Sequence, residues 1–283
     1  RGVEVELGYR KKLGDVHLSL NGNVSYLENE ITYLGRGLKF LSDGQNFQST
    51  SFPITRTQIG QAFNAFYGFK SQGVFQTPED VANYKNSTGT VIQPNAKPGD
   101  FRWADLNDDG AITELDRTFI GNPTPDWTYG ITVNLDYKGF DFSALGQGVI
   151  GNQIFQALRR RDAGMTNYQA DALNRWTGPG STNSYPRLVD GDPNGNYTKP
   201  SDFYLEDGDY FRIKTLQLGY TLPQTLVKKA GLQRVRVYAM SENLVTFTKY
   251  TGFDPEIGGG VHSIDRGIYP QARSFMLGIN LGL

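Results

Sequence analysis

The sequence predicts an all-β chain that forms part of a transmembrane antiparallel β-barrel. Three observations predict it: seven segments in which apolar and polar residues alternate, the length of these segments, and connections that are alternately short and long. Alternation places every second side chain on the same face of a strand. The segments run for about 9–14 residues, whereas strands of soluble sheets average about 5–6 and a tilted strand needs about 9–11 to cross a bilayer.

The alternation is most regular in the third segment, where Tyr129, Ile131 and Val133 are separated by polar residues or glycine. In the fifth segment Phe211 and Ile213 have the opposite parity to the leucines that follow, which predicts a β-bulge near Lys214. The seven predicted strands are residues 3–9, 16–26, 127–137, 140–149, 209–222, 235–247 and 275–283.

The connections between these strands differ greatly in length. Three are short, whereas residues 30–125, 151–208 and 249–271 form long connections. Short turns at one end and long extracellular loops at the other are typical of outer-membrane β-barrels. Aromatic residues also gather at both ends of the strands, as in two interfacial girdles: Tyr9, Tyr137, Phe140 and Tyr220 at the short turns, and Tyr26, Trp127, Tyr129, Phe247 and Tyr250 at the long loops. A soluble β-sandwich also alternates, but it explains neither the strand length nor the loop asymmetry.

Seven strands cannot close a barrel by themselves. Bacterial single-chain barrels have even strand counts. An open sheet in lipid leaves unpaired backbone groups at two edges, and each such group costs several kcal/mol. We therefore expect further strands from the rest of the same polypeptide or from another chain. The sequence begins at Arg1 without a methionine or a signal peptide and reads as a fragment or a processed product.

The composition excludes several functions. The 28 Lys and Arg residues balance the 29 Asp and Glu residues, which argues against a nucleic-acid partner. The chain has no cysteine and two histidines, His17 and His262, so thiol nucleophiles and Cys- or His-rich metal centres are excluded. We expect no enzyme activity. His17 falls on the polar face of its strand, where we expect it to line the lumen or to be solvated.

Residues 105–116 resemble a calcium-binding loop. Asp105, Asn107 and Asp109 supply hard oxygen ligands, the carbonyl of Ala111 stands at the seventh position, and Asp116 at the twelfth. Gly110 permits the sharp turn, and aspartate at the twelfth position is shorter than the usual glutamate. These residues predict a structural calcium ion that stiffens the loop. The alternative is a turn rich in Asp and Asn that binds nothing.

Motifs along nearly the whole chain resemble the C-terminal region of the SusC/RagA family of TonB-dependent outer-membrane transporters. The segments that carry the resemblance are residues 66–70, 73–76, 99–103, 116–123, 127–130, 173–177, 210–214, 218–220, 241–244 and 269–275. The resemblance implies a 22-stranded barrel with an N-terminal plug. Residues 1–283 would then supply its last seven strands, with the plug absent from this chain.

The resemblance also implies a function and partners. Members of this family lie in the outer membrane of Gram-negative, Bacteroidetes-like cells and import oligosaccharides or peptides. They act with a SusD-like lipoprotein and take energy from TonB, which binds in the N-terminal part. The expected partners are therefore the remaining barrel and plug, the lipoprotein, TonB, outer-membrane lipid and the substrate. One alternative is a secreted or surface-anchored, calcium-stabilised β-rich adhesin or carbohydrate-binding module, which would be soluble without detergent. A second is an outer-membrane enzyme with its catalytic group in the lumen, which the scarcity of histidine disfavours.

The long connections hold several further features. Residues 78–84 read as a short helix capped by Thr77, and residues 169–176 as a second one. The basic run at residues 159–162 is expected to be a solvated face, or else a contact to lipopolysaccharide or a partner. Four loop aromatics can either pack in a core or stack on sugar rings: Trp103, Tyr168, Tyr185 and Tyr197.

Overall fold

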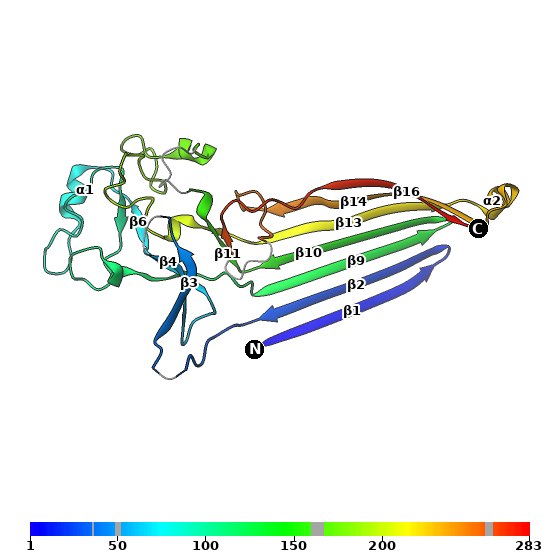
Figure 1. Cartoon of the computed structure of the whole chain (residues 1–283), viewed down its shortest axis with the longest axis horizontal. Helices are drawn as coiled ribbons and strands as arrows, with labels where there is room; N and C mark the ends of the chain where they lie inside the picture. The colour runs from blue at the N-terminus through cyan, green and yellow to red at the C-terminus, as the bar shows by residue number, and fades with distance from the viewer. Residues whose placement is uncertain (36, 49–51, 160–166, 258–262) are drawn as a thin grey trace.

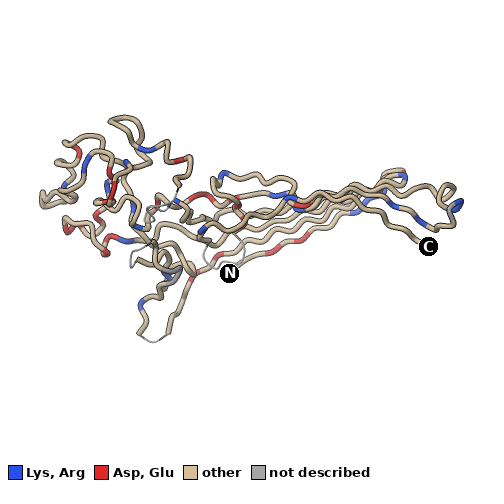
Figure 2. The backbone as a smooth tube through the Cα atoms, turned by 45° about the horizontal axis from the view of Figure 1, so that its top comes forward, with Lys and Arg blue, Asp and Glu red and all other residues tan. Residues whose placement is uncertain are grey.

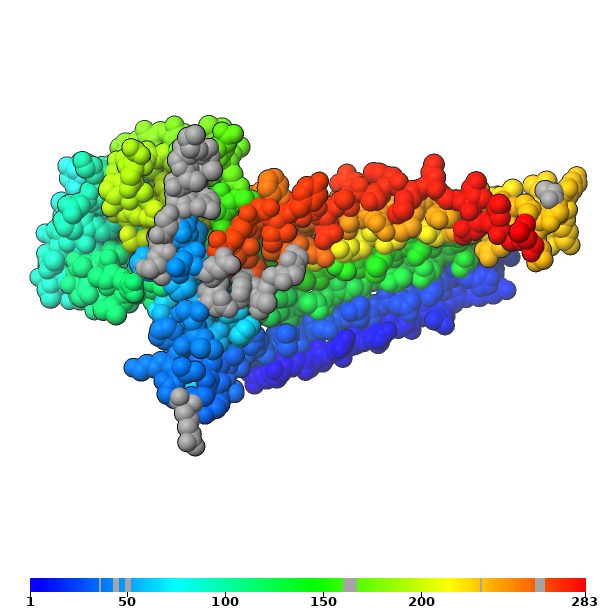
Figure 3. Space-filling model, in the orientation of Figure 1, coloured from blue at the N-terminus to red at the C-terminus, as the bar shows by residue number. Residues whose placement is uncertain are grey.

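A computed structural model describes residues 1–283 except 36, 49–51, 160–166 and 258–262. One long antiparallel sheet extends from a separate mass of folded loops (Figure 1). The space-filling view shows the same division between the sheet and the loop mass (Figure 3). The N-terminus lies at the loop end of the sheet, and the C-terminus lies at the end with the short turns (Figure 1).

Seven strands form the large sheet, and each pairs antiparallel with its neighbour in chain order. They are β1 (Gly2–Leu13), β2 (Val16–Leu27), β9 (Trp127–Tyr137), β10 (Phe140–Ile150), β13 (Tyr210–Thr221), β14 (Arg234–Thr248) and β16 (Ser274–Gly282). All seven predicted strands are therefore confirmed. Their lengths run from 9 to 15 residues, enough for a tilted strand to cross the hydrocarbon layer.

The β-bulge predicted near Lys214 is also confirmed. The pairing of β13 with both of its neighbours shifts between Ile213 and Thr215, so Lys214 has no counterpart on β10. The extra residue reverses the parity of the strand. Phe211 and Ile213 therefore lie on the same face as Leu216.

The register keeps apolar side chains on one face of the sheet and polar ones on the other. One apolar row crosses the sheet through Leu18, Leu135, Phe142, Leu218, Ala239 and Leu277. A polar row on the opposite face contains Lys12, His17, Asp136 and Asp141. The apolar side chains remain open: Leu7 is 72% exposed and Leu277 is 88% exposed. A soluble sandwich or surface module would bury such a face, whereas a barrel turns it to lipid.

The two outer strands of the sheet are β1 and β16, and each has one neighbour among the described strands. Every residue of β1 is exposed. The free edges therefore carry backbone N–H and C=O groups that need partners in hydrocarbon. The sheet is one sector of a barrel wall, and it needs further strands on both sides to close.

Aromatic side chains lie at both ends of the strands, as predicted. At the short-turn end the ring centroids of Phe140 and Tyr220 are 4.5 Å apart. At the loop end those of Tyr26 and Trp127 are 4.8 Å apart. These pairs stand where the girdles of an outer-membrane barrel meet the membrane surfaces.

The long connections form three small sheets that the sequence did not predict. One contains β3 (Phe40–Asn46), β4 (Pro53–Gln58), β5 (Ala65–Gly68) and β8 (Thr118–Gly121). A second pairs β6 (Ser71–Val74) with β7 (Phe101–Trp103). The third contains β12 (Leu205–Asp207), β11 (Gln153–Gln156) and β15 (Ile264–Asp265). In the third sheet, β11 and β12 belong to the second long connection and β15 to the last one. The pairing of β11 with β15 therefore joins these two loops.

Short helices complete the fold. The predicted helix is α1 (Pro78–Asn83), where Thr77 Oγ1 accepts the Asp80 N–H at 3.2 Å and Asp80 Oδ2 accepts the Thr77 N–H at 3.0 Å. The second predicted helix is a 3₁₀ turn, Ala170–Asn174, and α2 (Gln224–Val227) lies in the turn between β13 and β14. The other 3₁₀ turns are Glu114–Asp116, Ala157–Arg159, Asp202–Tyr204 and Lys228–Ala230. Each described helix is too short to cross a membrane.

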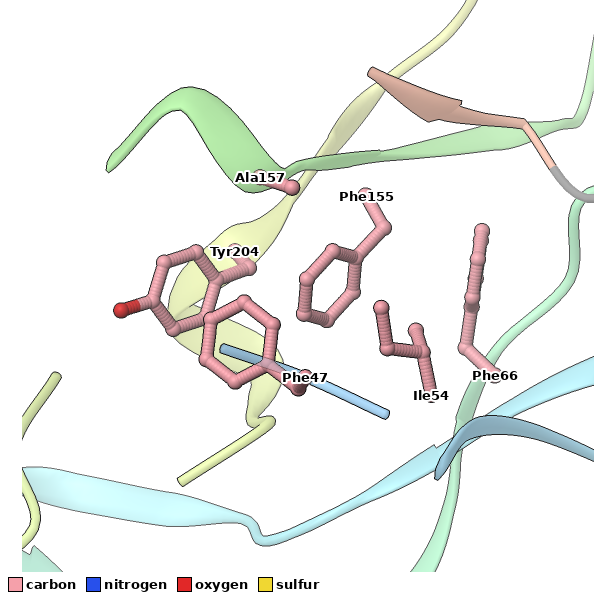
Figure 4. Close-up of a cluster of buried hydrophobic side chains, with 6 residues drawn as sticks. All are labelled: Phe47, Ile54, Phe66, Phe155, Ala157 and Tyr204. Carbon is pink, nitrogen blue, oxygen red and sulfur yellow. The ribbon is translucent and has the colours of Figure 1, made fainter. Parts of the chain in front are cut away.

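The hydrophobic core lies in the loop mass rather than against the large sheet. Phe47, Ile54 and Phe66 from the first long connection pack against Phe155 and Tyr204 from the second (Figure 4). These five side chains are almost completely buried. Phe203 packs against this cluster and against two neighbouring aromatic clusters. The loops therefore fold as one body, while the sheet leaves its apolar face for lipid.

Gly219 on β13 allows an ion pair to cross the strand. Arg236 on β14 reaches over Gly219 to Asp141 on β10, and its Nε donates to Asp141 Oδ1 at 2.9 Å. A Cβ atom at position 219 would lie 2.6 Å from Asp141 Oδ1 and against the Arg236 guanidinium. Glycine is therefore required here if the pair is to join three strands.

We expect Gly219→Ala to destabilise the barrel by about 1–3 kcal/mol, because the added methyl group displaces the ion pair. The control is Gly22→Ala, where a Cβ would lie 3.8 Å from its nearest neighbour. That change should cost no more than about 0.5 kcal/mol. Thermal unfolding of the full-length protein in detergent measures both, and equal melting temperatures for the two variants would contradict the account.

Candidate functional site

An ionic cluster joins the last long loop to the polar face of the sheet. It contains Arg212 and Lys214 of β13 with Asp254 and Glu256 of the loop, and we call it the outer ionic cluster. Arg212 pairs with both carboxylates, its Nη1 donating to Glu256 Oε2 at 2.8 Å, and Lys214 Nζ lies 2.8 Å from the same oxygen. Arg212 is 3% exposed.

The bulge lets β13 carry basic residues and leucines of the same sequence parity on opposite faces. Without it, Leu216 and Leu218 would share the polar face with Arg212, because alternate residues of a regular strand lie on one face. Asp254 Oδ2 also accepts the Gln271 N–H at 2.8 Å, which holds both ends of the loop. Buried pairs of this kind specify geometry more than they add stability. The loop after β14 is therefore fixed against the lumen side of the wall.

A second polar region lies on the same face at the short-turn end. A hollow of about 750 Å³ is lined there by His17, Asn134, Asp136, Gln217 and Arg236, among others. His17 is exposed in it, as the prediction for the polar face requires. The lumen side of the wall is thus charged and open to water at this end, as expected for a wet or plugged barrel interior.

Asp100 holds the loop mass together through charge-assisted hydrogen bonds. Its carboxylate, 1% exposed, accepts Arg187 Nε at 2.7 Å and Arg187 Nη2 at 3.1 Å. It also accepts Asn196 Nδ2 and the Lys97 N–H, both at 2.9 Å. Since Arg187 and Asn196 belong to the second long connection, this single carboxylate joins it to the first.

The basic run at residues 159–162 is only partly described, and its described residue is not a solvated face. Arg159 pairs with Asp171 at 2.8 Å and with Glu206. Its side chain is 13% exposed. Residues 160–162 lie outside the described residues, as does His262. The expectation of a solvated face is therefore wrong for Arg159, because folding of the loops brings two carboxylates to it.

Arg56 and Arg117 lie against aromatic rings and form no ion pair within the described residues. Their guanidinium carbons are 3.5 Å and 4.8 Å from the centroid of the Tyr67 ring. Arg117 Nη2 donates to the carbonyls of Tyr67, at 2.8 Å, and Pro53. Burial and the neighbouring Arg56 charge lower the pKa of Arg117 to about 10. Cation–π contacts hold these two residues, and the pair makes this loop sheet electropositive.

The predicted calcium loop forms a tight turn in the structure. Asp105 Oδ2 accepts the Gly110 N–H at 2.9 Å, and Asn107 Nδ2 donates to Asp109 Oδ2 at 2.8 Å. The Ala111 N–H donates to Asp109 Oδ1 at 2.9 Å. Gly110 has a φ of 83°, the conformation for which glycine is required. The structure thus brings Asp105, Asn107, Asp109 and Ala111 together in one turn.

The fit of this turn to a calcium ion is partial. Asp105 Oδ1 is buried without a hydrogen-bond partner, and a buried carboxylate oxygen of this kind is a suitable calcium ligand. Asp116 is fully buried, and its two oxygens accept the N–H groups of Leu106 at 2.8 Å and Thr113 at 2.7 Å. In the described part of the chain, no three Asp, Glu, His or Cys side chains form a preformed metal cluster. The calcium site remains a prediction.

Three of the four loop aromatics pack in the core. Trp103, Tyr185 and Tyr197 are 1%, 6% and 1% exposed. Tyr168 is 61% exposed. Of the four, Tyr168 alone presents a ring to solvent, and stacking on sugar rings is excluded for the other three in this conformation.

Comparison with known proteins identifies relatives of this chain, although no family model matches it. TonB-dependent receptor P3 of Formosa agariphila is 36% identical over 258 residues, which are 85% of this chain and 25% of the receptor. TonB-dependent receptor SusC of Bacteroides thetaiotaomicron is 26% identical over 277 residues, 94% of this chain and 24% of SusC. The solved structure of the RagAB peptide transporter is 25% identical with a TM-score of 0.73, covering 99% of this chain and 29% of the solved chain.

The large sheet and its two faces define the chain as a sector of an outer-membrane β-barrel. The chain belongs to the SusC/RagA family of TonB-dependent receptors, which are outer-membrane proteins. It spans about a quarter of the length of the curated relatives that it matches.

We expect Asp100→Ala to loosen the loop mass and leave the barrel wall intact. The change leaves the Arg187 charge without its partner and should lower the stability of the loop mass by about 3 kcal/mol. This is the lower end of the range for breaking a buried ion pair, because the partly exposed Arg187 side chain can be rehydrated. The control is Asp207→Ala, which removes an exposed pair with Lys249 at 3.9 Å worth less than about 1 kcal/mol. Limited proteolysis of the full-length protein in outer membranes measures the effect. Unchanged cleavage of the loops in Asp100→Ala would contradict this role.

Proposed function

We propose that the protein containing this chain imports nutrients across the outer membrane, as a TonB-dependent receptor that acts with a SusD-like surface lipoprotein. One observation carries the proposal: a lipid-facing wall and a folded mass of outer loops are joined by the outer ionic cluster on the lumen side. Such a construction suits a pore whose outer opening has a fixed shape. The family of the chain supports the same function.

In the proposal, energy coupling involves parts of the receptor outside residues 1–283. In the proposal, further strands of the N-terminal barrel pair with β1 and β16, and the plug occupies the lumen against the polar face. TonB binds the N-terminal part and supplies the energy for import. The charged hollow near His17 and Asp136 lies on the wall that would face the plug.

Exposed apolar side chains in the loops support a protein partner outside the membrane. Tyr33 is 69% exposed, Ile59 is 50% exposed and Phe63 is 42% exposed, and all three lie in the first long connection. Apolar side chains that gather on a loop surface are typical of protein interfaces. In the proposal this surface contributes to contacts with the lipoprotein.

The substrate class in the proposal is oligosaccharides, with peptides as the second class. SusC is a TonB-dependent receptor, and RagAB is described as a peptide transporter, so the family resemblance alone does not choose between them. Arg56, which is half-buried, would favour an anionic substrate of either class. In the proposal, exposed loop aromatics such as Tyr168 contact sugar rings.

The proposal includes one structural calcium ion in the turn at residues 105–116. Asp105, Asn107 and Asp109 would supply side-chain oxygens, and Ala111 its carbonyl. Asp116 would act mainly by closing the turn through the Leu106 and Thr113 N–H groups, and would need to rotate to bind the ion directly. The ion would compensate the charge of the turn and stiffen it.

We expect calcium to protect this turn from proteolysis in the full-length protein, and Asp105→Asn to abolish the protection. The control is Asp108→Asn in the same loop, because Asp108 instead bonds to the Ser87 N–H at 3.0 Å and to its hydroxyl. Asp108→Asn should keep the calcium effect. Equal protease sensitivity with calcium and with a chelator in the unmodified protein would exclude the ion.

The import function is tested by purification and by uptake. Full-length protein purified from detergent-solubilised outer membranes should carry a surface lipoprotein with it. Deletion of its gene should abolish uptake of one oligosaccharide or peptide class, and an uncoupler should do the same. Purification of the protein alone, together with unchanged uptake of both classes after deletion, would contradict the proposal.

A further inference from the structure

The lipid-facing side of the sheet carries an apolar trough near the short turns. Its volume is about 530 Å³. Val237 and Ala239 of β14 form the floor, Leu218 of β13 forms one wall and Leu277 of β16 the other. The trough exists because the small Ala239 lies between two leucines in the same row. Leu218 and Leu277 are 54% and 88% exposed, so the trough is open along its length.

One end of the trough reaches the membrane surface. Tyr220 and Phe140, whose rings pack together, line that end and belong to the aromatic girdle. Girdle aromatics lie at the level of the lipid headgroups, and the short turns of outer-membrane barrels face the periplasm. The trough therefore opens into the periplasmic leaflet, which consists of phospholipid.

The turn beside this opening is basic. It links the two strands that form the floor and one wall, and it contains Lys228 and Lys229, with no acidic residue between positions 221 and 236. Both lysines are exposed and neither forms an ion pair within the described residues. Figure 2 shows basic residues at this end of the sheet. Leu226, 57% exposed, precedes them in α2 and gives the turn an apolar side chain.

We propose that the trough and the two lysines form a binding site for one anionic phospholipid of the periplasmic leaflet. An acyl chain lies in the trough between Leu218 and Leu277, and the phosphate lies at Lys228 and Lys229. β14 begins at Arg234, three residues or about 10 Å before Val237, so the turn that carries the two lysines lies beyond the girdle end of the trough. This inference rests on the membrane location of the sheet and is independent of which nutrient is imported.

The two parts of the site contribute differently. Lipid tails are as apolar as leucine, so the trough gains nothing from hydrophobicity alone and contributes shape and van der Waals contact. The lysines contribute charge, about 1 kcal/mol for each basic residue near an anionic surface, or about fivefold in affinity. Selectivity for an anionic headgroup should therefore depend on the turn, and retention of the lipid on the trough.

The test uses the full-length receptor in nanodiscs of phosphatidylethanolamine with a minor share of phosphatidylglycerol, extracted into mild detergent and analysed by native mass spectrometry. The unmodified protein should retain phosphatidylglycerol in excess of its share. Lys228→Ala with Lys229→Ala should lower that preference about fivefold for each lysine removed. The matched control, Lys85→Ala with Lys97→Ala, removes two charges from the loop mass at the other end of the molecule and should leave the preference unchanged.

A second pair of variants tests the trough. Ala239→Phe fills the floor and should lower the retained lipid of both kinds, whereas Val24→Phe adds the same ring to the lipid-facing side of β2 and should not. The lysine variants lie outside the sheet, so they remain informative if Ala239→Phe fails to assemble. Retention of the two lipids in proportion to the bilayer, or retention unaffected by the lysine pair, would overturn the proposal. Loss of import in the same variants is not required by it.

Discussion

The structure depends on one constraint: in hydrocarbon, each backbone N–H and C=O group of the wall must pair with a neighbouring strand. This holds the seven strands in one continuous ladder, and the side chains select the register of that ladder. A slip of one residue would exchange the two faces, placing Lys12 and Asp136 in lipid and Leu18 and Leu135 in the lumen. The register is therefore set by side chains as strongly as by the backbone.

The other features follow from a wall of a single layer. Such a wall has no second sheet against which to bury side chains. The aromatic core therefore lies in the loops, which are outside the membrane and surrounded by water, so that burial of apolar side chains is favourable there. Joining the loops to the wall then requires contacts on the polar face. The outer ionic cluster provides them at one end, and the pair of Arg236 with Asp141 joins strands near the other. Each uses a local departure from regular sequence, a bulge at Lys214 and a glycine at position 219.

The sequence was sufficient to predict the wall, because alternation over nine or more residues is a long-range signal that tertiary contacts do not override. The bulge at Lys214 was predictable for the same reason. The loop sheets were not, since strands such as Ile264–Asp265 are too short to show a period. Nor was the cluster around Arg159, whose partners lie 12 and 47 residues away. In the candidate calcium turn, residue types and spacing predicted the turn. The use of Asp116 for backbone hydrogen bonds depends instead on the 3₁₀ helix Glu114–Asp116, whose first residue follows Thr113.

The central claim is that alternate residues of each long strand face lipid and lumen. It is tested most directly by spin labels on single cysteines introduced along β9 in the full-length protein in bilayers. Residues 1–283 contain no cysteine of their own. We expect oxygen accessibility to peak at Tyr129, Ile131, Val133 and Leu135, and accessibility to a water-soluble nickel chelate to peak at the residues between them. Equal access of the nickel chelate to both sets would contradict the account.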